Sequence, residues 1–334
     1  MADEVSLKVQ TNKQVFPVTG GDQLVYVLME VMPTGAVADV QMPLNFCLVL
    51  DHSGSMSGRK LASLKEAAQL AIDQMTPQDM TSVIIFDDSV KVVAPSQPVT
   101  DPASLKIQID NIRAAGGTKI SKGMQQGLDE LAKGRGPDRV NRMLLLTDGE
   151  TYGDEDRCRR LAAQAGQQDI PISALGLGDD WNEQLLDDIA QASGGTSDFI
   201  PSARPETILR TFQREVQGAQ ATVVHNTELL LRIVPGVIPR AVWRVTPIIT
   251  KLGHRALSER DVQVSLGSLE REQGQSILVE LMVSSRQAGT YRVAQSEIKY
   301  DVPALGLSGE KVKEDIILTF SQDPAQATES NPYV

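Results

Sequence analysis

The spacing of hydrophobic residues changes twice along the chain. Between residues 43 and 218, short apolar runs alternate with longer stretches whose apolar residues recur every three or four positions. The short runs are typical of buried strands, and the longer stretches are typical of amphipathic helices. Before residue 43 and after residue 218, the pattern is that of strands separated by turns. We therefore expect a central α/β segment with β structure on both sides of it in the sequence.

The central segment predicts a parallel sheet covered by helices. Its apolar runs include residues 45–50, 82–86 and 143–147, and the stretches 61–75 and 120–131 have helical periodicity. Strands that alternate with helices form parallel sheets with right-handed crossovers. Because the run 45–50 is short and continuously apolar, we expect it to be a central strand that is buried on both faces.

The flanking strands are expected to form one β domain. Residues 1–42 contain two strand patterns joined by a turn, and two strands alone do not form a stable domain. Residues 219–322 contain several strand patterns, such as 229–234 and 316–320, and short turns between strands are typical of an antiparallel sandwich. We predict that the N-terminal strands complete this sandwich, so that residues 43–218 are inserted into a discontinuous domain. The polar residues 323–334 are expected to form a flexible tail.

Oxygen-bearing side chains follow the strands of the central segment where the strands end. Five of them are expected to meet at one sheet edge: Asp51, Ser53, Ser55, Thr118 and Asp148. The first three follow the run 45–50, the fourth follows two glycines, and the fifth follows the run 143–147. Asp and Ser are common in turns, so the first three alone would be weak support for a site. The two further positions favour a site, because ligands of open α/β sheets bind at the carboxyl ends of the strands.

This constellation resembles the von Willebrand factor A (vWA) domain with its metal-ion-dependent adhesion site, over residues 43 to 217 approximately. The resemblance implies an α/β fold with a Rossmann-like, mostly parallel central sheet. It also implies that Ser53, Ser55 and Thr118 coordinate a metal directly, while Asp51 and Asp148 act through waters or hold the hydroxyls. The layout with a flanking all-β antiparallel sandwich is similar to that of bacterial proteins related to the inter-alpha-trypsin inhibitor heavy chains.

The chemistry of these ligands indicates a hard divalent cation. Carboxylates and hydroxyls from three loops suit Mg²⁺ or Mn²⁺ better than the larger Ca²⁺. A cation held mostly by neutral hydroxyls keeps much of its charge, so we expect an Asp or Glu carboxylate from a partner protein to complete the site. The predicted function is a metal-dependent adaptor or scaffold module that binds proteins inside the cell. Candidate partners include an ATPase or a signalling protein.

Charge and cysteine content narrow the setting. The net charge is −11. Nucleic acids and anionic membranes are bound by clustered basic faces, so we expect neither of them as a partner. The two cysteines, Cys47 and Cys158, are expected to be free thiols in a reducing compartment. Residues 1–4 have no features of a secretory signal, and no uncharged run is long enough to cross a bilayer. We therefore expect a cytoplasmic protein without membrane insertion.

Two alternative functions are open. A metal-dependent phosphohydrolase would need a base, and His52 and Glu150 flank the predicted site, but groups beside a site are more often part of its rim. Asp87 and Asp88 are likewise expected to be part of the rim. Three other classes are excluded by missing residues. A dinucleotide site needs a glycine pattern that is absent, and an aspartyl-phosphate phosphatase needs a second Asp where Ser53 stands. A serine hydrolase needs a Gly-x-Ser-x-Gly motif, which is also absent. We therefore expect no enzyme activity. In the other alternative, the metal only braces the loops.

Overall fold

The chain forms two compact units in the computed structural model. The structure describes residues 3–334 except residues 137, 152, 179–180, 202–205, 248, 253–254, 259–260 and 328–329. One unit comprises residues 41–222, and the other comprises residues 1–40 together with residues 223–334.

The 41–222 unit is built on a six-stranded sheet with the strand order β6-β5-β4-β7-β8-β9. Its strands are β4 (Leu44–Asp51), β5 (Met80–Phe86), β6 (Val90–Pro98), β7 (Val140–Thr147), β8 (Ile172–Leu177) and β9 (Ser197–Ile200). All neighbours are parallel except β5 and β6, which are antiparallel. All eight residues of β4 are buried, as expected for a central strand covered on both faces. The predicted α/β class with a mostly parallel sheet is confirmed.

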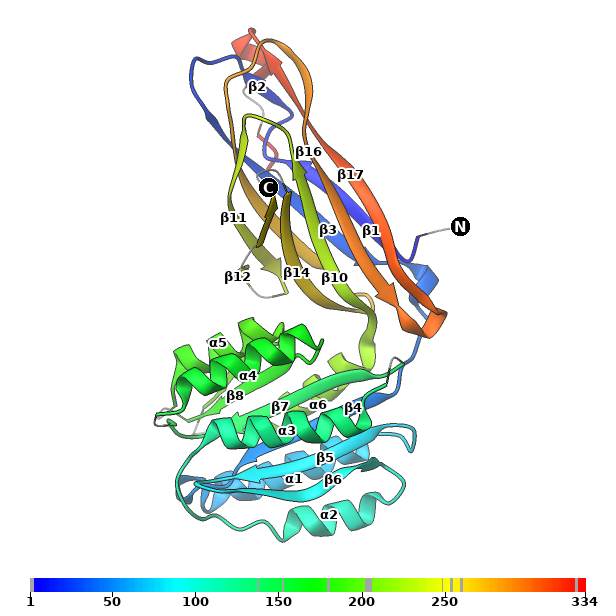
Figure 1. Ribbon diagram of the computed structural model, residues 1–334, viewed down its shortest axis with the longest axis vertical. Helices are drawn as coiled ribbons and strands as arrows, with labels where there is room; N and C mark the ends of the chain where they lie inside the picture. The colour runs from blue at the N-terminus through cyan, green and yellow to red at the C-terminus, as the bar shows by residue number, and fades with distance from the viewer. Residues whose placement is uncertain are drawn as a thin grey trace. The chain divides into compact units, whose positions relative to one another are not determined.

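Helices cover both faces of this sheet (Figure 1). They are α1 (Arg59–Asp73), α2 (Pro102–Asp110), α3 (Ile120–Gly134), α4 (Glu155–Gln167), α5 (Glu183–Ser193) and α6 (Thr207–Ala221). Helices α3, α4 and α5 share a buried apolar cluster with one face of the strands, which includes Cys47 and Val49 of β4. Helix α1 packs against α6 and α2. The strand residues therefore alternate between two apolar layers, which fixes the register of the sheet.

The chain order places a switch point at β4. From β4 the chain passes through α1 to β5 on one side, and it later returns through α3 to β7 on the other side. The register pairs Asp51 with Phe86 and Leu50 with Leu146, so the carboxyl ends of β4, β5 and β7 lie at the same edge. Such an edge, next to the strand where the order reverses, is where open α/β sheets bind ligands.

The other unit contains two sheets of mostly antiparallel strands. Its first sheet has the order β1-β3-β15-β11-β12, and its second has the order β13-β14-β10-β16-β17-β2. The strands are β1 (Val5–Thr11), β2 (Val15–Pro17), β3 (Gln23–Pro33), β10 (Thr222–Ile233), β11 (Val237–Thr246), β12 (Thr250–Lys251), β13 (Arg255–Ser258), β14 (Asp261–Glu270), β15 (Gln275–Val283), β16 (Gly289–Val302) and β17 (Leu307–Ser321). Strand β3 pairs with both β1 and β15, so the N-terminal residues supply an interior strand.

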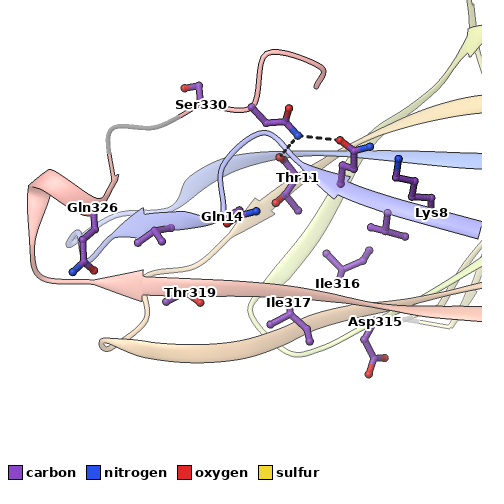
Figure 2. Close-up of a pocket in the computed structure, with 13 residues that line it drawn as sticks. Lys8, Thr11, Gln14, Asp315, Ile316, Ile317, Thr319, Gln326 and Ser330 are labelled. Atoms are coloured by element: carbon purple, nitrogen blue, oxygen red, sulfur yellow. Dashed lines mark hydrogen bonds between the residues drawn. The ribbon is translucent and has the colours of Figure 1, made fainter.

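A groove with a volume of about 850 Å³ lies between β1 and β17 (Figure 2). The last residues of the chain reach its rim, where the Asn331 amide donates to the Gln10 side chain at 3.1 Å and to the Thr11 carbonyl at 3.4 Å. The Asn331 backbone N–H also donates to the Asn12 carbonyl at 2.8 Å. The segment predicted to be a flexible tail therefore makes specific contacts with the start of the chain.

Candidate metal centre

The carboxylate of Asp51 is fixed at the end of β4. It is fully buried, and its Oδ1 accepts a hydrogen bond from the Ser53 backbone N–H at 2.7 Å. Its Oδ2 accepts a hydrogen bond from the Thr147 hydroxyl, at the end of β7, at 2.6 Å. Burial raises the pKa of Asp51, although the hydrogen bonds from Thr147 and Ser53 act in the opposite direction. The carboxylate is thus held in one orientation, in surroundings that disfavour its charge unless a cation is near.

The hydroxyls of Ser53 and Ser55 converge on Asp148. The two Oγ atoms lie 3.0 Å apart, and the Ser55 Oγ donates to Asp148 Oδ1 at 2.7 Å. The Ser53 Oγ lies 3.4 Å from the same oxygen. A short 3₁₀ turn, η2 (Gly54–Met56), brings the two serines to this position, because it folds the loop back after β4. Residues that are 93 and 95 positions apart in the sequence therefore share one oxygen atom.

The loop that carries Thr118 lies against the loop after β4. The backbone N–H of Gly54 donates to the Gly116 carbonyl at 3.1 Å, and the N–H of Ala115 donates to the His52 carbonyl at 2.8 Å. A Cβ atom on Gly149, the residue after Asp148, would lie 3.4 Å from the Thr118 Oγ1. The Thr118 hydroxyl is therefore next to the Asp148 loop, and all five predicted residues lie at the same sheet edge.

Asp87 and Asp88, which follow β5, support the Thr118 loop. Gly116 has a φ of +70°, and a Cβ atom there would lie 2.6 Å from the Asp87 carboxylate. The Gly117 N–H donates to the Asp88 carboxylate at 2.8 Å. Gly116 is therefore needed because its backbone is in the left-handed region against Asp87, and Gly117 because a Cβ atom there would lie 2.6 Å from the Asp88 carboxylate. Asp87 and Asp88 therefore lie against the Thr118 loop, and the rim position expected for them stays a prediction.

Thr151 and Asp154 hold the loop from the other side. The Thr151 Oγ1 accepts a hydrogen bond from the Ile120 N–H at 3.3 Å, and Asp154 accepts one from the Ser121 N–H at 3.0 Å. Both N–H groups belong to the first turn of α3, where no intrahelical acceptor is available. The Thr151 hydroxyl also lies 3.3 Å from the Thr118 carbonyl oxygen. The segment after Asp148 thus caps α3 and links the two loops.

A cation of the chain itself contacts the site. The Lys60 ammonium lies 2.6 Å from Asp148 Oδ2, and the side chain of Asp148 has no exposed surface. This contact was not predicted from the sequence, and neither were those of Thr147, Thr151 and Asp154. No local pattern marks this contact, because the partners are 88 residues apart and lysine side chains on helices are mostly exposed to solvent.

His52 and Glu150, the two residues considered as bases, lie in different surroundings. The His52 Nδ1 lies 2.8 Å from the Arg113 carbonyl oxygen, and its Nε2 lies 3.7 Å from the Asp87 carboxylate. Both ring nitrogens therefore face groups of the loops rather than the serine hydroxyls. Glu150 is exposed to solvent. This geometry gives the imidazole a role in joining loops.

The donor set fits a hard divalent cation. Two carboxylates and the hydroxyls of two serines and a threonine offer only oxygen atoms, the ligands that Mg²⁺ and Mn²⁺ prefer. Within the described residues, no group of three or more His, Cys, Asp and Glu side chains is placed to hold a metal. A site here would therefore depend on hydroxyls as well as on its two carboxylates. The Lys60 ammonium, 2.6 Å from Asp148, places one positive charge of the chain beside these oxygens.

Comparison with known proteins identifies the family. The family model for the von Willebrand factor type A domain matches residues 45–214. The chain is 38% identical to an uncharacterized protein, sll0103, from Synechocystis, over 80% of this chain and 64% of that protein. The chain belongs to the vWA domain family. The resemblance predicted from the sequence is confirmed, including the one to inter-alpha-trypsin inhibitor heavy chains: heavy chain H3 of Rattus norvegicus is 31% identical over 56% of this chain.

Solved structures of vWA proteins share the fold. The von Willebrand factor type A protein from Catenulispora acidiphila superposes with a TM-score of 0.82 and 19% identity, over 98% of this chain and 76% of that one. The ArnB paralog VWA2 from Sulfolobus acidocaldarius gives a TM-score of 0.63 and 14% identity, over 98% of this chain and 79% of that one. The present vWA chain spans 64% of the length of sll0103 and 22% of heavy chain H3.

Cys47 and Cys158 are both free and buried, and burial raises the pKa of each thiol to about 12. No helix in the described part of the chain is long and apolar enough to cross a membrane.

Proposed function

We propose that this vWA chain is a metal-dependent protein-binding module that holds Mg²⁺ or Mn²⁺ at the carboxyl edge of β4 and uses it to bind an acidic residue of a partner protein. The observation that carries the proposal is the convergence of the Ser53 and Ser55 hydroxyls on Asp148, with the Thr118 hydroxyl beside the same loop. These oxygens come from three separate loops of one sheet edge. Family membership supports the proposal, because the family resemblance implies these residues as ligands.

Each residue has a role that follows from its contacts. Ser53, Ser55 and Thr118 would hold the cation through their hydroxyls. Asp51 orders the loop by accepting the Ser53 N–H, and Asp148 orients both serine hydroxyls. When bound, the cation would supply a positive centre for a carboxylate from outside the chain. Because three of the five ligands are neutral, the chain's own residues leave part of that charge unbalanced.

The proposed partner group is an Asp or Glu side chain. Removal of one member of a desolvated charge pair at an interface costs on the order of 2 to 5 kcal/mol. A Glu→Gln change in the partner should therefore weaken binding by roughly a hundredfold or more. An ATPase or a signalling protein remains the proposed kind of partner.

Calorimetry tests the metal site directly. We expect the purified chain to bind about one Mn²⁺ or Mg²⁺, with heat that is lost in Asp51→Ala and strongly reduced in Thr118→Ala. Thr100→Ala changes an exposed threonine outside the proposed ligand set and is the matched control. If both site variants bind metal as the control does, the assignment of the ligands is wrong.

The two alternatives make different predictions. A metal-dependent phosphohydrolase should turn over generic phosphoesters and stop when metal is chelated. If the metal only braces the loops, a partner should bind equally well in Mg²⁺ and in EDTA while the fold stays intact. In that case recognition would lie elsewhere, and the groove between β1 and β17 would be the next surface to test (Figure 2).

We also propose that residues 1–42 and 219–322 form one folding domain around the inserted vWA domain. The pairing of β3 with β15 over nine residue pairs supports this, because β3 lies between two other strands of its sheet. Deletion of residues 1–40 should abolish amide protection in β15. Full protection of β15 in hydrogen exchange after the deletion would contradict a shared domain. A cytoplasmic location is proposed from the two free cysteines, and cell fractionation tests it.

A further inference from the structure

Lys60 occupies an unusual position for a lysine. It is the second residue of α1, and the N-terminal end of a helix carries a partial positive charge that disfavours a cation. Its side chain is only 27% exposed, and its Nζ lies 2.6 Å from Asp148 Oδ2. The ammonium is therefore held where the helix opposes it, which indicates that the interaction with Asp148 outweighs the cost.

Asp148 is a buried carboxylate that lies against a positive group of the chain. Its carboxylate has no exposed surface, and its other oxygen accepts a hydrogen bond from Ser55. A buried carboxylate without a cation is strongly disfavoured, because the loss of hydration is not compensated. Asp51, a second buried carboxylate, lies in the same group of loops and adds negative charge. Lys60 supplies the positive charge that this group of acids requires.

We propose that Lys60 is an internal counter-cation of the metal site, which stabilises the metal-free chain and competes electrostatically with the metal for Asp148. This inference rests on the proposed function, since it concerns the same site. Lys60 repels a divalent cation among the Asp148, Ser53 and Ser55 oxygens, because like charges several Å apart interact strongly where water is partly excluded. The lysine thereby lowers metal affinity, and the metal has to compete with it before a partner can bind.

The competition predicts effects of opposite sign when the charge is removed. Lys60→Met should lower the Tm in EDTA by roughly 2 to 4 °C or more, because Asp148 loses its counter-ion. The same substitution should tighten Mn²⁺ binding by roughly ten- to hundredfold, the effect of one unit charge on a nearby divalent cation at intermediate dielectric. A lysine that only braced the loops would give the first effect but would leave metal affinity unchanged or weaker.

Calorimetric Mn²⁺ titration and thermal unfolding in EDTA should be measured on the full chain and its variants. Lys60→Gln is the second neutral variant, and its amide can still donate to Asp148 if Lys60→Met does not fold. Lys60→Arg keeps the charge and should keep the wild-type Kd within about threefold. Lys65→Met removes a charge from the same helix, where Lys65 donates to the Asp110 carbonyl at 2.8 Å, and should leave Kd unchanged.

The outcomes separate the two proposals. Tighter binding in the neutral Lys60 variants, with lower stability in EDTA, supports the counter-cation. If the wild type binds Mn²⁺ and both neutral variants bind it equally well or more weakly, the counter-cation role is overturned. The metal site itself is then still supported. No binding by the wild type or by any variant overturns the metal site itself. Equal tightening in Lys65→Met would show a general charge effect and would also overturn the specific role of Lys60.

Discussion

Replacement of Gly116 by alanine should damage the metal site through a defined steric conflict. Gly116 has a φ of +70°, in the left-handed region that glycine tolerates and alanine does not. An added Cβ would lie 2.6 Å from Asp87 Oδ2, 2.8 Å from its Cγ and 2.9 Å from its Cβ. All three distances are shorter than van der Waals contact, so either the aspartate or the Thr118 loop has to move.

The cost can be estimated from the contacts that would be lost. The left-handed conformation costs alanine about 1 to 2 kcal/mol. The Asp87 carboxylate accepts hydrogen bonds from the Ser89 N–H at 2.6 Å and from the Ser89 hydroxyl at 2.7 Å. Hydrogen bonds to charged groups contribute about 1.5 to 3 kcal/mol each, so moving the carboxylate costs about 2 kcal/mol even if one bond survives. If the loop moves instead, the Gly54 bond to Gly116 is lost and Thr118 is displaced.

Thr118 can bind metal only when the loop is in its original position. The free-energy cost of restoring that position against the Asp87 contact therefore weakens metal binding. A cost of about 2 kcal/mol corresponds to a roughly 30-fold weaker Kd for Mn²⁺. The matched control is Gly194→Ala, where φ is +76° and an added Cβ has no neighbour within 4 Å. Gly194 ends α5, so its substitution has the backbone cost without the clash. Calorimetry should show weaker binding only in Gly116→Ala, and equal Kd values in the two variants would refute the reasoning.

Three further predictions concern buried groups. Thr147→Val removes the hydroxyl that donates to buried Asp51, and urea denaturation should show a loss of about 1.5 to 3 kcal/mol; a loss below about 0.5 kcal/mol would contradict the role of this bond. The Arg232 guanidinium, with two lysines, lowers the pKa of Glu297 to about 2 from its usual 4.5, so its contribution to stability is complete above pH 4.5 and is lost as the pH falls toward 2. Glu297→Gln should therefore lower the Tm at pH 7 but change it little near pH 2, and an equal change at both would contradict this. Cys47 and Cys158 should resist alkylation in the native chain and react in urea, because burial raises both thiol pKa values; labelling of the folded chain would be inconsistent.

The fold class could be predicted because its signals are local. The run that becomes β4 is continuously apolar, and the helices of the 41–222 unit show a 3.6-residue period, so their existence follows from the sequence. The extent of the strands in the other unit could not be predicted as well. Strand β17 begins at Leu307, whereas the apolar run that predicts it starts only at residue 316. Residues 310–315 are mostly charged, so the sequence pattern does not mark them as a strand. Their pairing with β16 makes them a strand, and Lys311 and Lys313 neutralise the buried Glu297 there.

The observed bounds of strand β10 also differ from those predicted by the sequence pattern. The apolar patterns 221–224 and 229–234 predict two separate strands, yet a single strand extends from Thr222 to Ile233. Its pairing with β16 is irregular between His225 and Glu228. Such an irregularity breaks the alternation of buried and exposed residues on which the sequence reading depends.

The sequence by itself determined which residues are candidates for the site, because hydroxyls and carboxylates after buried strands are visible as a pattern, and the family resemblance connects Asp51 to Asp148. Only the tertiary structure decided what surrounds them. The Thr147 hydroxyl, the Lys60 ammonium and the Asp88 carboxylate act on these loops across 29 to 96 positions of sequence. Contacts of that range are set by strand order and helix packing, and a lysine or threonine has the same local pattern whether it faces water or a buried carboxylate.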